Sequence, residues 1–399
     1  MEMSDTQLDI IPDSPIPAHI IGEVESKLAY VDETITKAVV HPAGDKITLH
    51  LSSSPIQEER EHLVRKIQHV VDTMAQGGFK PKIQILEDYL DRPVPYNTDP
   101  TGPLIECNEI NQEAIGVYSL GPLVAGLVDY FESRFLELAQ FFDAKPYRFP
   151  TLIPAKYMER VNYFRAFPHS LSFATHLRED LDVIDGFAEH TSCDELGALT
   201  TAGDSFAPIK TLLSPAVCYH LYFANADRTI SEGQITATAV GNCFRYESIN
   251  LSSLERMWNF TMREVIFVGG KEFVLSNREK AREVVQRIFK EIGLAYKVES
   301  ANDPFFIGEF RKQAAFQSAF QLKYEIRASL PYKSSTLAVG SFNYHQDFFG
   351  RHLNISLPDG SLAHTGCVAF GLERMAFAFL SQFGLDTKNW PATVRGARS

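Results

Sequence analysis

Several features that would assign this chain of 399 residues to a particular compartment are scarce or missing. No apolar run approaches the length of a membrane-spanning helix, and the first residues lack the basic and then apolar order of a signal peptide. Cysteine is rare, and its odd count without framework spacing predicts reduced thiols instead of disulfides. The cysteines are Cys107, Cys193, Cys218, Cys243 and Cys367. We therefore expect a cytoplasmic protein that does not contact a membrane.

Basic residues are also in deficit. The chain has 38 Lys and Arg against 50 Asp and Glu, which gives a formal net charge of −12. Residues 1–100 contain 9 basic and 17 acidic residues, and 9 − 17 gives −8 for this part alone. Nucleic-acid binding depends on Lys and Arg that neutralise phosphates. The N-terminal region is therefore a poor candidate for binding RNA, although acidity also simply favours solubility.

The first quarter of the chain predicts a small domain followed by a linker. Residues 1–17 contain three prolines and four acidic residues without a periodic apolar pattern, which predicts a disordered tail. Residues 35–52 predict two strands around a Pro-Ala-Gly-Asp turn, and the apolar spacing over 56–76 predicts a helix. With a further strand, these elements form a small α+β domain over residues 18–90. The proline-rich residues 91–103 predict the linker.

The remaining residues, 104–399, predict one larger domain. Strong amphipathic helices are expected over residues 122–143 and 271–292. Strand-like runs dominate the second half, and a last helix is expected to begin near Gly366. Many strands followed by a closing helix predict an α+β fold in which helices flank an antiparallel sheet.

A first chemical pattern lies at residues 242–264, NCFRYESINLSSLERMWNFTMRE, which predict a strand, a loop and a return strand. Arg245 and Glu247 are two apart, so on a strand they would point to the same face. A guanidinium at such a place suits a phosphate. Taken alone, the pattern is also that of a surface hairpin with ordinary ion pairs.

A second pattern, GCVAFGLER at residues 366–374, predicts a glycine-containing turn that leads into a helix. Cys367, Gly371 and Arg374 are spaced i, i+4 and i+7, which would place them on one helix face. Small residues there would let the helix approach a neighbouring backbone or a ligand closely. The alternative is a buried amphipathic helix, because the aromatic residues between 370 and 379 are typical of a core.

Two cysteines and one glutamate near these patterns have the composition of a metal site. Cys367 lies in the second pattern, Glu264 ends the first, and Cys218 precedes it. Glu264 is four residues after Phe260, so on the return strand both face the same side. Two thiolates and one carboxylate are three zinc ligands, and a site with three protein ligands keeps a fourth position open for catalysis.

Other assignments of the cysteines and histidines remain open. A cytoplasmic cysteine is most often a small buried hydrophobic residue, and we assign Cys107, Cys193 and Cys243 to that class. His220 and His364 lie close in sequence to the candidate thiols and compete with them, because histidine is the common metal ligand.

In their order along the chain, these patterns resemble the signature motifs of class II aminoacyl-tRNA synthetases. The segment around Pro154 is similar to the first motif, residues 242–264 resemble the second, and residues 366–374 resemble the third. Several segments are more similar to zinc-dependent atypical seryl-tRNA synthetases, and most of all to their truncated homologues, the amino acid:[carrier protein] ligases. These segments, which span about residues 100–399, are FPHSLSFATHL, SPAVCYHLYF, FRYE, ERMWNFTMRE, SFNYHQDFFG and GCVAFGLERMAFAFL.

The resemblance implies an ATP site. Arg245 would contact the α-phosphate, where negative charge builds as the amino-acid carboxylate attacks, and Arg374 would bind the γ-phosphate. These two arginines are therefore the expected catalytic residues. Glu247 would accept a hydrogen bond from the adenine amino group, and Phe260 would stack on the adenine. The remaining expected ATP contacts are Arg256, Met257, Ala338, Val339, Gly340 and Ser341.

The resemblance also implies an amino-acid site and an acceptor. Cys218, Glu264 and Cys367 would bind zinc, whose open position takes the α-amine of a small amino acid, and Glu264 and Asn343 would contact this substrate. The product would be an aminoacyl-adenylate, from which the acyl group passes to the phosphopantetheine thiol of a holo carrier protein. Mg²⁺ would accompany ATP, no tRNA is expected to bind, and a homodimer is expected because class II cores usually dimerise.

One departure from the family pattern keeps other functions open. Seryl enzymes have a glutamate for magnesium in the strand before the Ser/Asn signature, where this chain has Leu337 or Ala338. An inactive paralogue that acts as a binding module would explain this loss, although Arg245, Glu247 and Arg374 are all present. The other alternative is a zinc-dependent seryl-tRNA synthetase-like enzyme that charges tRNA, which predicts a basic arm where this chain is acidic.

Overall fold

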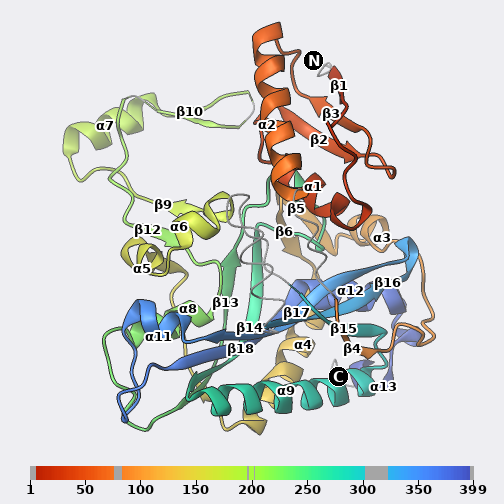
Figure 1. Ribbon diagram of the computed structural model, residues 1–399, viewed down its shortest axis with the longest axis vertical. Helices are drawn as coiled ribbons and strands as arrows, with labels where there is room; N and C mark the ends of the chain where they lie inside the picture. Colours follow the sequence, from red (N-terminus) through yellow and green to blue (C-terminus); the bar gives the residue numbers. More distant parts are fainter. Residues whose placement is uncertain (1–5, 76–82, 196, 202, 302–321, 396–399) are drawn as a thin grey trace.

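The computed structural model describes residues 6–75, 83–195, 197–201, 203–301 and 322–395. Within them, a small N-terminal unit lies at the top of Figure 1, above a larger unit that is built on a long sheet. No helix in the described part of the chain combines the length and the apolar character that crossing a bilayer requires.

The N-terminal unit is a three-stranded antiparallel sheet that packs against two helices, with the strand order β1-β3-β2. Its elements are β1 (Thr6–Ile10), η1 (Ala18–Ile20), α1 (Ile21–Leu28), β2 (Ile35–Val40), β3 (Ile47–Leu51) and α2 (Gln57–Ala75). The predicted pair of strands and the predicted helix are present. The prediction of a disordered tail is wrong for Thr6–Ile10, because β1 pairs with β3 and buries Leu8 and Ile10 in the core of this unit.

An eight-stranded sheet organises the larger unit, with the strand order β4-β15-β16-β17-β18-β14-β13-β7. Neighbouring strands are antiparallel except β13 and β7, which are parallel. The strands are β4 (Ile85–Asp88), β7 (Lys145–Pro146), β13 (Ile235–Phe244), β14 (Asn259–Gly269), β15 (Tyr296–Ser300), β16 (Lys323–Leu330), β17 (Ser335–Gln346) and β18 (His364–Gly371). The sheet and its helices confirm the predicted α+β fold.

Three long helices cover one face of this sheet: α4 (Pro122–Phe141), α9 (Lys271–Ile292) and α12 (Leu372–Phe383) (Figure 1). Their apolar stripes enclose an aromatic core in which the rings of Phe135 and Phe370 stack with centroids 3.7 Å apart. The helices expected over 122–143 and 271–292 are therefore present. The opposite face is covered at one end by α8 (Cys218–Ala224) and α11 (Phe348–Leu353).

The helix that we expected to begin near Gly366 and to be the last one is α12, which begins six residues later, at Leu372, and is followed by the short α13 (Ala392–Arg395). Residues 364–371 form β18, which hydrogen-bonds to β14 on one side and to β17 on the other. The run GCVAFG is short and apolar, and such a run suits a buried strand as well as a buried helix. Because the run forms a strand between two others, Cys367 lies on β18 whereas Arg374 lies on α12. The two residues therefore do not share a helix face.

The boundary between the two units also differs from the predicted one. β4, which we placed in the small domain, is the edge strand of the large sheet and pairs with β15. In the predicted linker, the Arg92 guanidinium donates to the carbonyl oxygens of Phe289 and Leu294 at 3.3 and 2.8 Å. The linker therefore packs against the larger unit.

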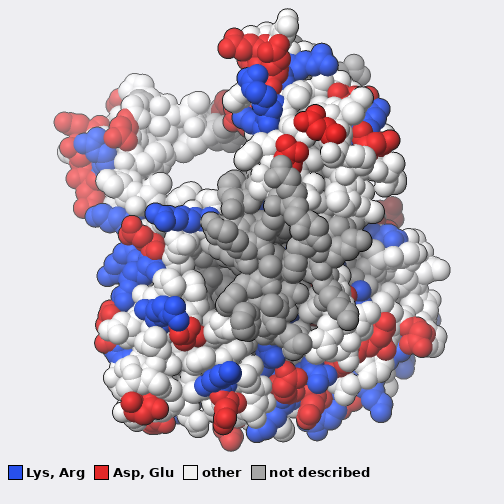
Figure 2. Space-filling view, in the orientation of Figure 1, with Lys and Arg blue, Asp and Glu red and all other residues white. Residues whose placement is uncertain are grey.

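An arm formed by residues 175–195, 197–201 and 203–210 projects from the larger unit beside the N-terminal unit (Figure 1). No residue of its helix α7 (Leu181–His190) is buried, and Asp and Glu side chains gather at its outer end (Figure 2). The remaining elements are α3 (Thr101–Glu106), β5 (Ile110–Ala114), β6 (Val117–Leu120), β8 (Leu152–Pro154), α5 (Ala155–Arg160), α6 (Tyr163–Ala166), η2 (Pro168–Ser170), β9 (Phe173–Ala174), β10 (Ser192–Cys193), β11 (Leu199–Thr200), β12 (Thr211–Leu213), η3 (Ser248–Asn250), η4 (Pro331–Lys333), η5 (Thr387–Asn389) and α13 (Ala392–Arg395).

Candidate functional site

Cys218, Glu264 and Cys367 come together on the sheet face that α4, α9 and α12 leave uncovered. One ligand atom from each lies within 4.8 Å of the other two, and all three residues are buried. Cys218 is the first residue of α8, Glu264 lies on β14, and Cys367 lies on the neighbouring strand β18. The three side chains thus reach one point from three separate elements.

Strand register explains why two of these side chains meet. Cys367 pairs with Ile266, which is two residues from Glu264 and therefore on the same face of β14. The first turn of α8 approaches this face, and the N–H of Val217 donates to Glu264 Oε1 at 3.0 Å. The backbone carbonyl of Glu264 accepts a hydrogen bond from Thr238 Oγ1 at 2.8 Å. The carboxylate is therefore held in one orientation.

The electrostatics of this cluster fit a divalent cation. Glu264 Oε2 is buried and has no hydrogen-bond partner among the described residues. Burial raises the pKa of the Glu264 carboxyl, and the Cys367 thiol together with burial raises the pKa of the Cys218 thiol well above its usual value. Three such acidic groups in one buried place are costly unless a cation compensates them. Two sulfur ligands and one oxygen ligand form a set that zinc accepts.

The competing histidines do not belong to this cluster. His220 Nε2 lies 3.1 Å from Ser214 Oγ, and its ring stacks on that of Phe149. His364 Nδ1 lies 2.6 Å from the hydroxyl of Tyr344. Both rings are thus engaged elsewhere, which leaves the thiols and the carboxylate as the candidate ligands.

The cysteines outside the cluster divide into two classes. Cys243 is buried beside Val217 and Ala239, as predicted for a small hydrophobic residue. Cys107 and Cys193 are exposed, so their assignment to the buried class is wrong. Cys107 follows the short helix α3, and Cys193 lies in the two-residue strand β10, whose residues are both exposed.

Arg245 directly follows β13 and is fixed by the backbone. Its Nε donates to the carbonyl of Pro215 at 2.9 Å, and its guanidinium lies 5.4 Å from the centroid of the Phe260 ring. Glu247 is not on a strand, because β13 ends at Phe244 and the chain turns into η3. The expectation that Arg245 and Glu247 share a strand face is therefore wrong. Glu247 instead accepts a hydrogen bond from Arg256 Nη1 at 2.7 Å.

Arg374, near the start of α12, reaches the same region. Its Nη1 donates to the carbonyl of Ala338 at 3.3 Å. Burial lowers the pKa of its guanidinium, and the charges of Glu247, Arg256 and Arg245 act on it as well. These four charged groups therefore lie close together beside the sheet.

The central strand β17 connects this charged region with the three candidate ligands. Asn343 pairs with Cys367, and its Nδ2 lies 3.4 Å from Cys367 Sγ and 2.9 Å from Ser341 Oγ. At Gly340 a Cβ atom would lie 2.8 Å from the carbonyl oxygen of Ala369, so β17 and β18 approach each other too closely for a side chain. Val339 points into the helix-covered core, which leaves only its backbone near the site.

Not every expected ATP contact lies on this face. The side chain of Met257 is buried in the core beneath the helices. One carboxylate beside the expected ATP contacts was not identified from the sequence. Glu325 on β16 pairs directly with Ser341 on β17. Its carboxylate contacts Arg327 at 2.8 Å and Lys323 at 3.3 Å. Only the register between β16 and β17 places it there, and a single sequence does not specify that register.

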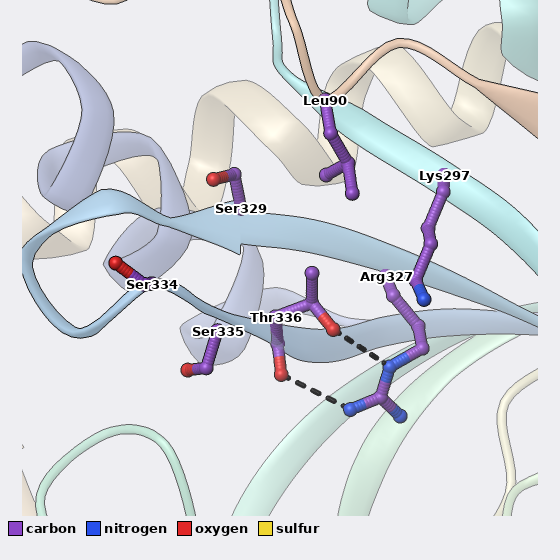
Figure 3. Close-up of a pocket in the computed structure, with 7 residues that line it drawn as sticks. All are labelled: Leu90, Lys297, Arg327, Ser329, Ser334, Ser335 and Thr336. Carbon is purple, nitrogen blue, oxygen red and sulfur yellow. Dashed lines mark hydrogen bonds between the residues drawn. The ribbon is translucent and has the colours of Figure 1, made fainter.

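Two cavities lie in the larger unit. One of about 450 Å³ lies at the turn between β16 and β17, and the residues that line it are Leu90, Lys297, Arg327, Ser329, Ser334, Ser335 and Thr336 (Figure 3). Arg327 donates to both the hydroxyl and the carbonyl of Thr336, as the dashed lines in Figure 3 show. The second, of about 210 Å³, is lined by Val217, His220 and Gly241 among others, so it adjoins the residue that holds Glu264.

No protein-family model matches this sequence, but curated proteins do. Amino acid–[acyl-carrier-protein] ligase 1 of Bradyrhizobium diazoefficiens is 35% identical over 249 residues, which are 62% of this chain and 74% of that protein. Ligase 2 of the same organism is 34% identical over 249 residues, covering 62% and 72%. The type-2 serine–tRNA ligase of Methanococcus aeolicus is 24% identical over 390 residues, covering 94% and 74%.

Among solved structures, this chain is similar to M. kandleri SerRS in a complex with A. aeolicus tRNASec. The TM-score is 0.72 at 20% identity, and the match covers 98% of this chain and 77% of that one. The cytoplasmic serine–tRNA ligase of Naegleria fowleri in complex with AMP matches with a TM-score of 0.57 at 11% identity, covering 86% and 72%. At these identities the likeness shows a shared fold, the class II synthetase fold that the sequence predicts.

Proposed function

The chain belongs to the family of amino acid–[acyl-carrier-protein] ligases, and from this premise we propose that it transfers a small amino acid to the phosphopantetheine thiol of a holo carrier protein. ATP would drive the reaction through an aminoacyl-adenylate, and a zinc ion held by this chain would supply a position for the amine of the amino acid. The observation that carries the proposal is the buried cluster of Cys218, Glu264 and Cys367, one strand away from the amide of Asn343.

Cys218, Glu264 and Cys367 would hold the zinc ion. When bound, zinc supplies a Lewis acid whose fourth position takes the α-amine of the substrate as a free base. Asn343 is placed to contact the amino acid, because its Nδ2 already lies against Cys367 Sγ. Glu264 borders the same position through its unpartnered oxygen. Selection of a small side chain then depends on the volume beside the cluster.

The charged groups around Arg245 suit the nucleotide. Phe260 and Arg245 lie together, so a base on the ring would place the α-phosphate near the guanidinium. Arg374 and Arg256 add two positive charges for the outer phosphates, and Glu247 is the acceptor for the adenine amino group. The backbone from Ala338 to Ser341 would complete this site.

The proposed reaction has two steps. A carboxylate oxygen of the amino acid attacks the α-phosphorus of ATP and pyrophosphate leaves, while Arg245 stabilises the developing charge. The phosphopantetheine thiol then attacks the acyl carbon, loses its proton, and AMP leaves as the thioester forms. Because the mixed anhydride is already activated, most of the rate acceleration in the second step would come from holding the thiol and the acyl carbon in the right geometry.

Magnesium has a different candidate ligand from the one expected. Ala338 has no carboxylate, whereas Glu325 lies opposite Ser341 on the adjacent strand. We propose that Glu325 and Ser341 border the Mg²⁺ that accompanies ATP. This assignment removes the main argument for an inactive paralogue, since every expected charged nucleotide contact is present.

A second candidate function is tRNA charging. It is favoured by the match to a type-2 serine–tRNA ligase over 94% of this chain, against 62% for the carrier-protein ligases. The acidic balance of residues 1–100, 9 − 17 or −8, and the acidic arm in Figure 2 disfavour an RNA partner. Carrier-protein aminoacylation therefore remains the conclusion, with the homodimer as a further proposal.

Acceptor choice is tested with zinc-loaded protein, ATP, one small amino acid and either a holo carrier protein or tRNA. Intact-protein mass spectrometry should show the carrier heavier by one aminoacyl group, and the apo carrier should remain unmodified. Acid-stable charging of tRNA together with an unmodified carrier would reverse the order of the two candidates.

A further inference from the structure

The N-terminal unit contacts the loop that follows β13, residues 245–258, which we call the nucleotide loop. Three hydrogen bonds connect the end of α1 to this loop. Asn250 Nδ2 donates to the carbonyl of Ser26 at 3.2 Å, and Ser248 Oγ donates to the carbonyl of Ala29 at 3.2 Å. The hydroxyl of Tyr30 donates to the carbonyl of Tyr246 at 3.4 Å. A helix C-terminus has unsatisfied carbonyls to offer, and here the loop satisfies them.

The backbone of the nucleotide loop is strained at the point of contact. Ser248 has a φ of 51°, in the left-handed region that residues other than glycine seldom adopt. Such a conformation persists where surrounding contacts determine it, and it occurs often at ligand sites. The hydrogen bond from Ser248 to Ala29 is such a contact, and Glu247 is the residue directly before it.

A buried lysine lies in the same contact. Lys27 is 5% exposed and lies in α1 between Ser26 and Ala29. Burial lowers its pKa to about 8, whereas the charges of Glu23 and Glu247 favour its protonated form. His169 faces the same groups, and its pKa is lowered to about 4 by burial and by Lys27, so it is neutral at pH 7.

Glu247 lies between Tyr246 and Ser248, which both form hydrogen bonds to the end of α1, so it lies where the loop meets the helix turn that carries Lys27. Arg256, from the loop itself, contacts its carboxylate at 2.7 Å, and the ammonium of Lys27 acts on it from the N-terminal unit. Tyr30 packs in the same region, because its ring lies edge-on against that of His169 with centroids 4.9 Å apart. A carboxylate that Arg256 holds, in a loop that the end of α1 also holds, stays in one orientation, which an acceptor for adenine needs.

We propose that Lys27 is a positioning residue for ATP: together with the end of α1, it holds Glu247 and the strained nucleotide loop in the conformation that binds adenine. The N-terminal unit is then part of the nucleotide site and not only an appendage to it. This inference rests on the proposed ATP site, and it assigns a role to a unit for which the sequence suggested none.

The test compares Lys27→Met with Lys27→Arg and with a matched control, Lys66→Met. Lys66 belongs to the same unit but forms its ion pair with Asp32 of that unit. In amino-acid-dependent pyrophosphate exchange, Lys27→Met should raise KM for ATP about tenfold or more, with kcat and KM for the amino acid within about twofold. Lys27→Arg should restore most of the affinity, and Lys66→Met should behave as the wild type.

ATP affinity measured by calorimetry separates this inference from the proposed function. If the wild type binds ATP but exchanges no pyrophosphate, the proposed function fails, and the loss of ATP affinity in Lys27→Met still supports the positioning role. An unchanged ATP affinity in Lys27→Met overturns that role, as does a wild type that binds no ATP. If Lys27→Met does not fold, Asn250→Ala removes one loop contact alone, and it should weaken ATP binding several-fold.

Discussion

Replacing Glu264 by glutamine should change the stability of the protein in opposite directions with and without zinc. Without metal, the wild type buries a carboxylate oxygen that has no partner among the described residues. An unsatisfied buried polar group costs about 1–3 kcal/mol, and more when charged. Glutamine keeps the oxygen that accepts from Val217 N–H and removes the charge, so the metal-free variant should be more stable by about 1 kcal/mol.

With zinc, the order should reverse. Loss of an outer-shell partner alone costs 10–100-fold in metal affinity, so an amide in place of a ligating carboxylate should cost about 100-fold or more. At a free zinc concentration 100 times the wild-type Kd, binding stabilises the wild type by about 2.7 kcal/mol and the variant by less than about 0.5 kcal/mol. At about 2 °C per kcal/mol for a chain of this size, zinc should raise the wild-type Tm by about 5 °C.

The assay is thermal unfolding of both proteins in chelator and in buffered zinc. Cys243→Ala is the matched control, because this cysteine is buried next to the site but lies outside the three-residue cluster. It should lower Tm equally in both conditions and leave the zinc-dependent shift intact. A zinc-dependent rise in the Tm of Glu264→Gln as large as that of the wild type would show that Glu264 is not a ligand, and a large loss of stability in chelator would show that its carboxylate is not a cost to the metal-free protein.

Three further outcomes are expected. Asn343→Ala removes the amide at Cys367 Sγ, and zinc titration with a chelating dye should show about 10-fold weaker binding, together with a higher KM for the amino acid. Gly340→Ala introduces a methyl group 2.8 Å from a carbonyl oxygen and should cost about 1–3 kcal/mol in denaturant unfolding, whereas Gly270→Ala, which meets nothing within 4 Å, should cost little. Burial lowers the pKa of Lys27 to about 8, so KM for ATP should rise as pH increases through about 8, because Lys27 then loses its charge while His169, whose pKa is lowered to about 4, stays neutral. In Lys27→Arg, KM for ATP should stay flat to pH 9, and a parallel rise in both proteins would contradict this assignment.

The periodicity of single segments was sufficient to predict some features of the site and of the fold. The alternation along the hairpin of β13 and β14 placed Glu264 on the face of Phe260, because that parity depends only on the strand itself. The spacing of apolar residues likewise gave α9 over residues 271–292. Such features are encoded within one segment, so one sequence suffices to find them.

Other features depend on which segments pair, and those were missed. Cys367 was expected on a helix because a short buried run has no period that separates a helix from a strand. Glu325 approaches Ser341 only through the register of β16 on β17. The contact between α1 and the nucleotide loop joins Ala29 to Ser248, 219 residues apart, and no local pattern signals such a contact.

The most direct test of the account is ATP–pyrophosphate exchange over the common amino acids, with zinc-loaded and zinc-stripped wild type and with Cys218→Ala beside Cys243→Ala. We expect exchange with one small amino acid, lost on stripping, restored by zinc, retained in Cys243→Ala and absent in Cys218→Ala. Exchange that is equal in the stripped protein and in Cys218→Ala would contradict zinc-dependent activation, and no exchange with any amino acid would contradict activation of a common amino acid.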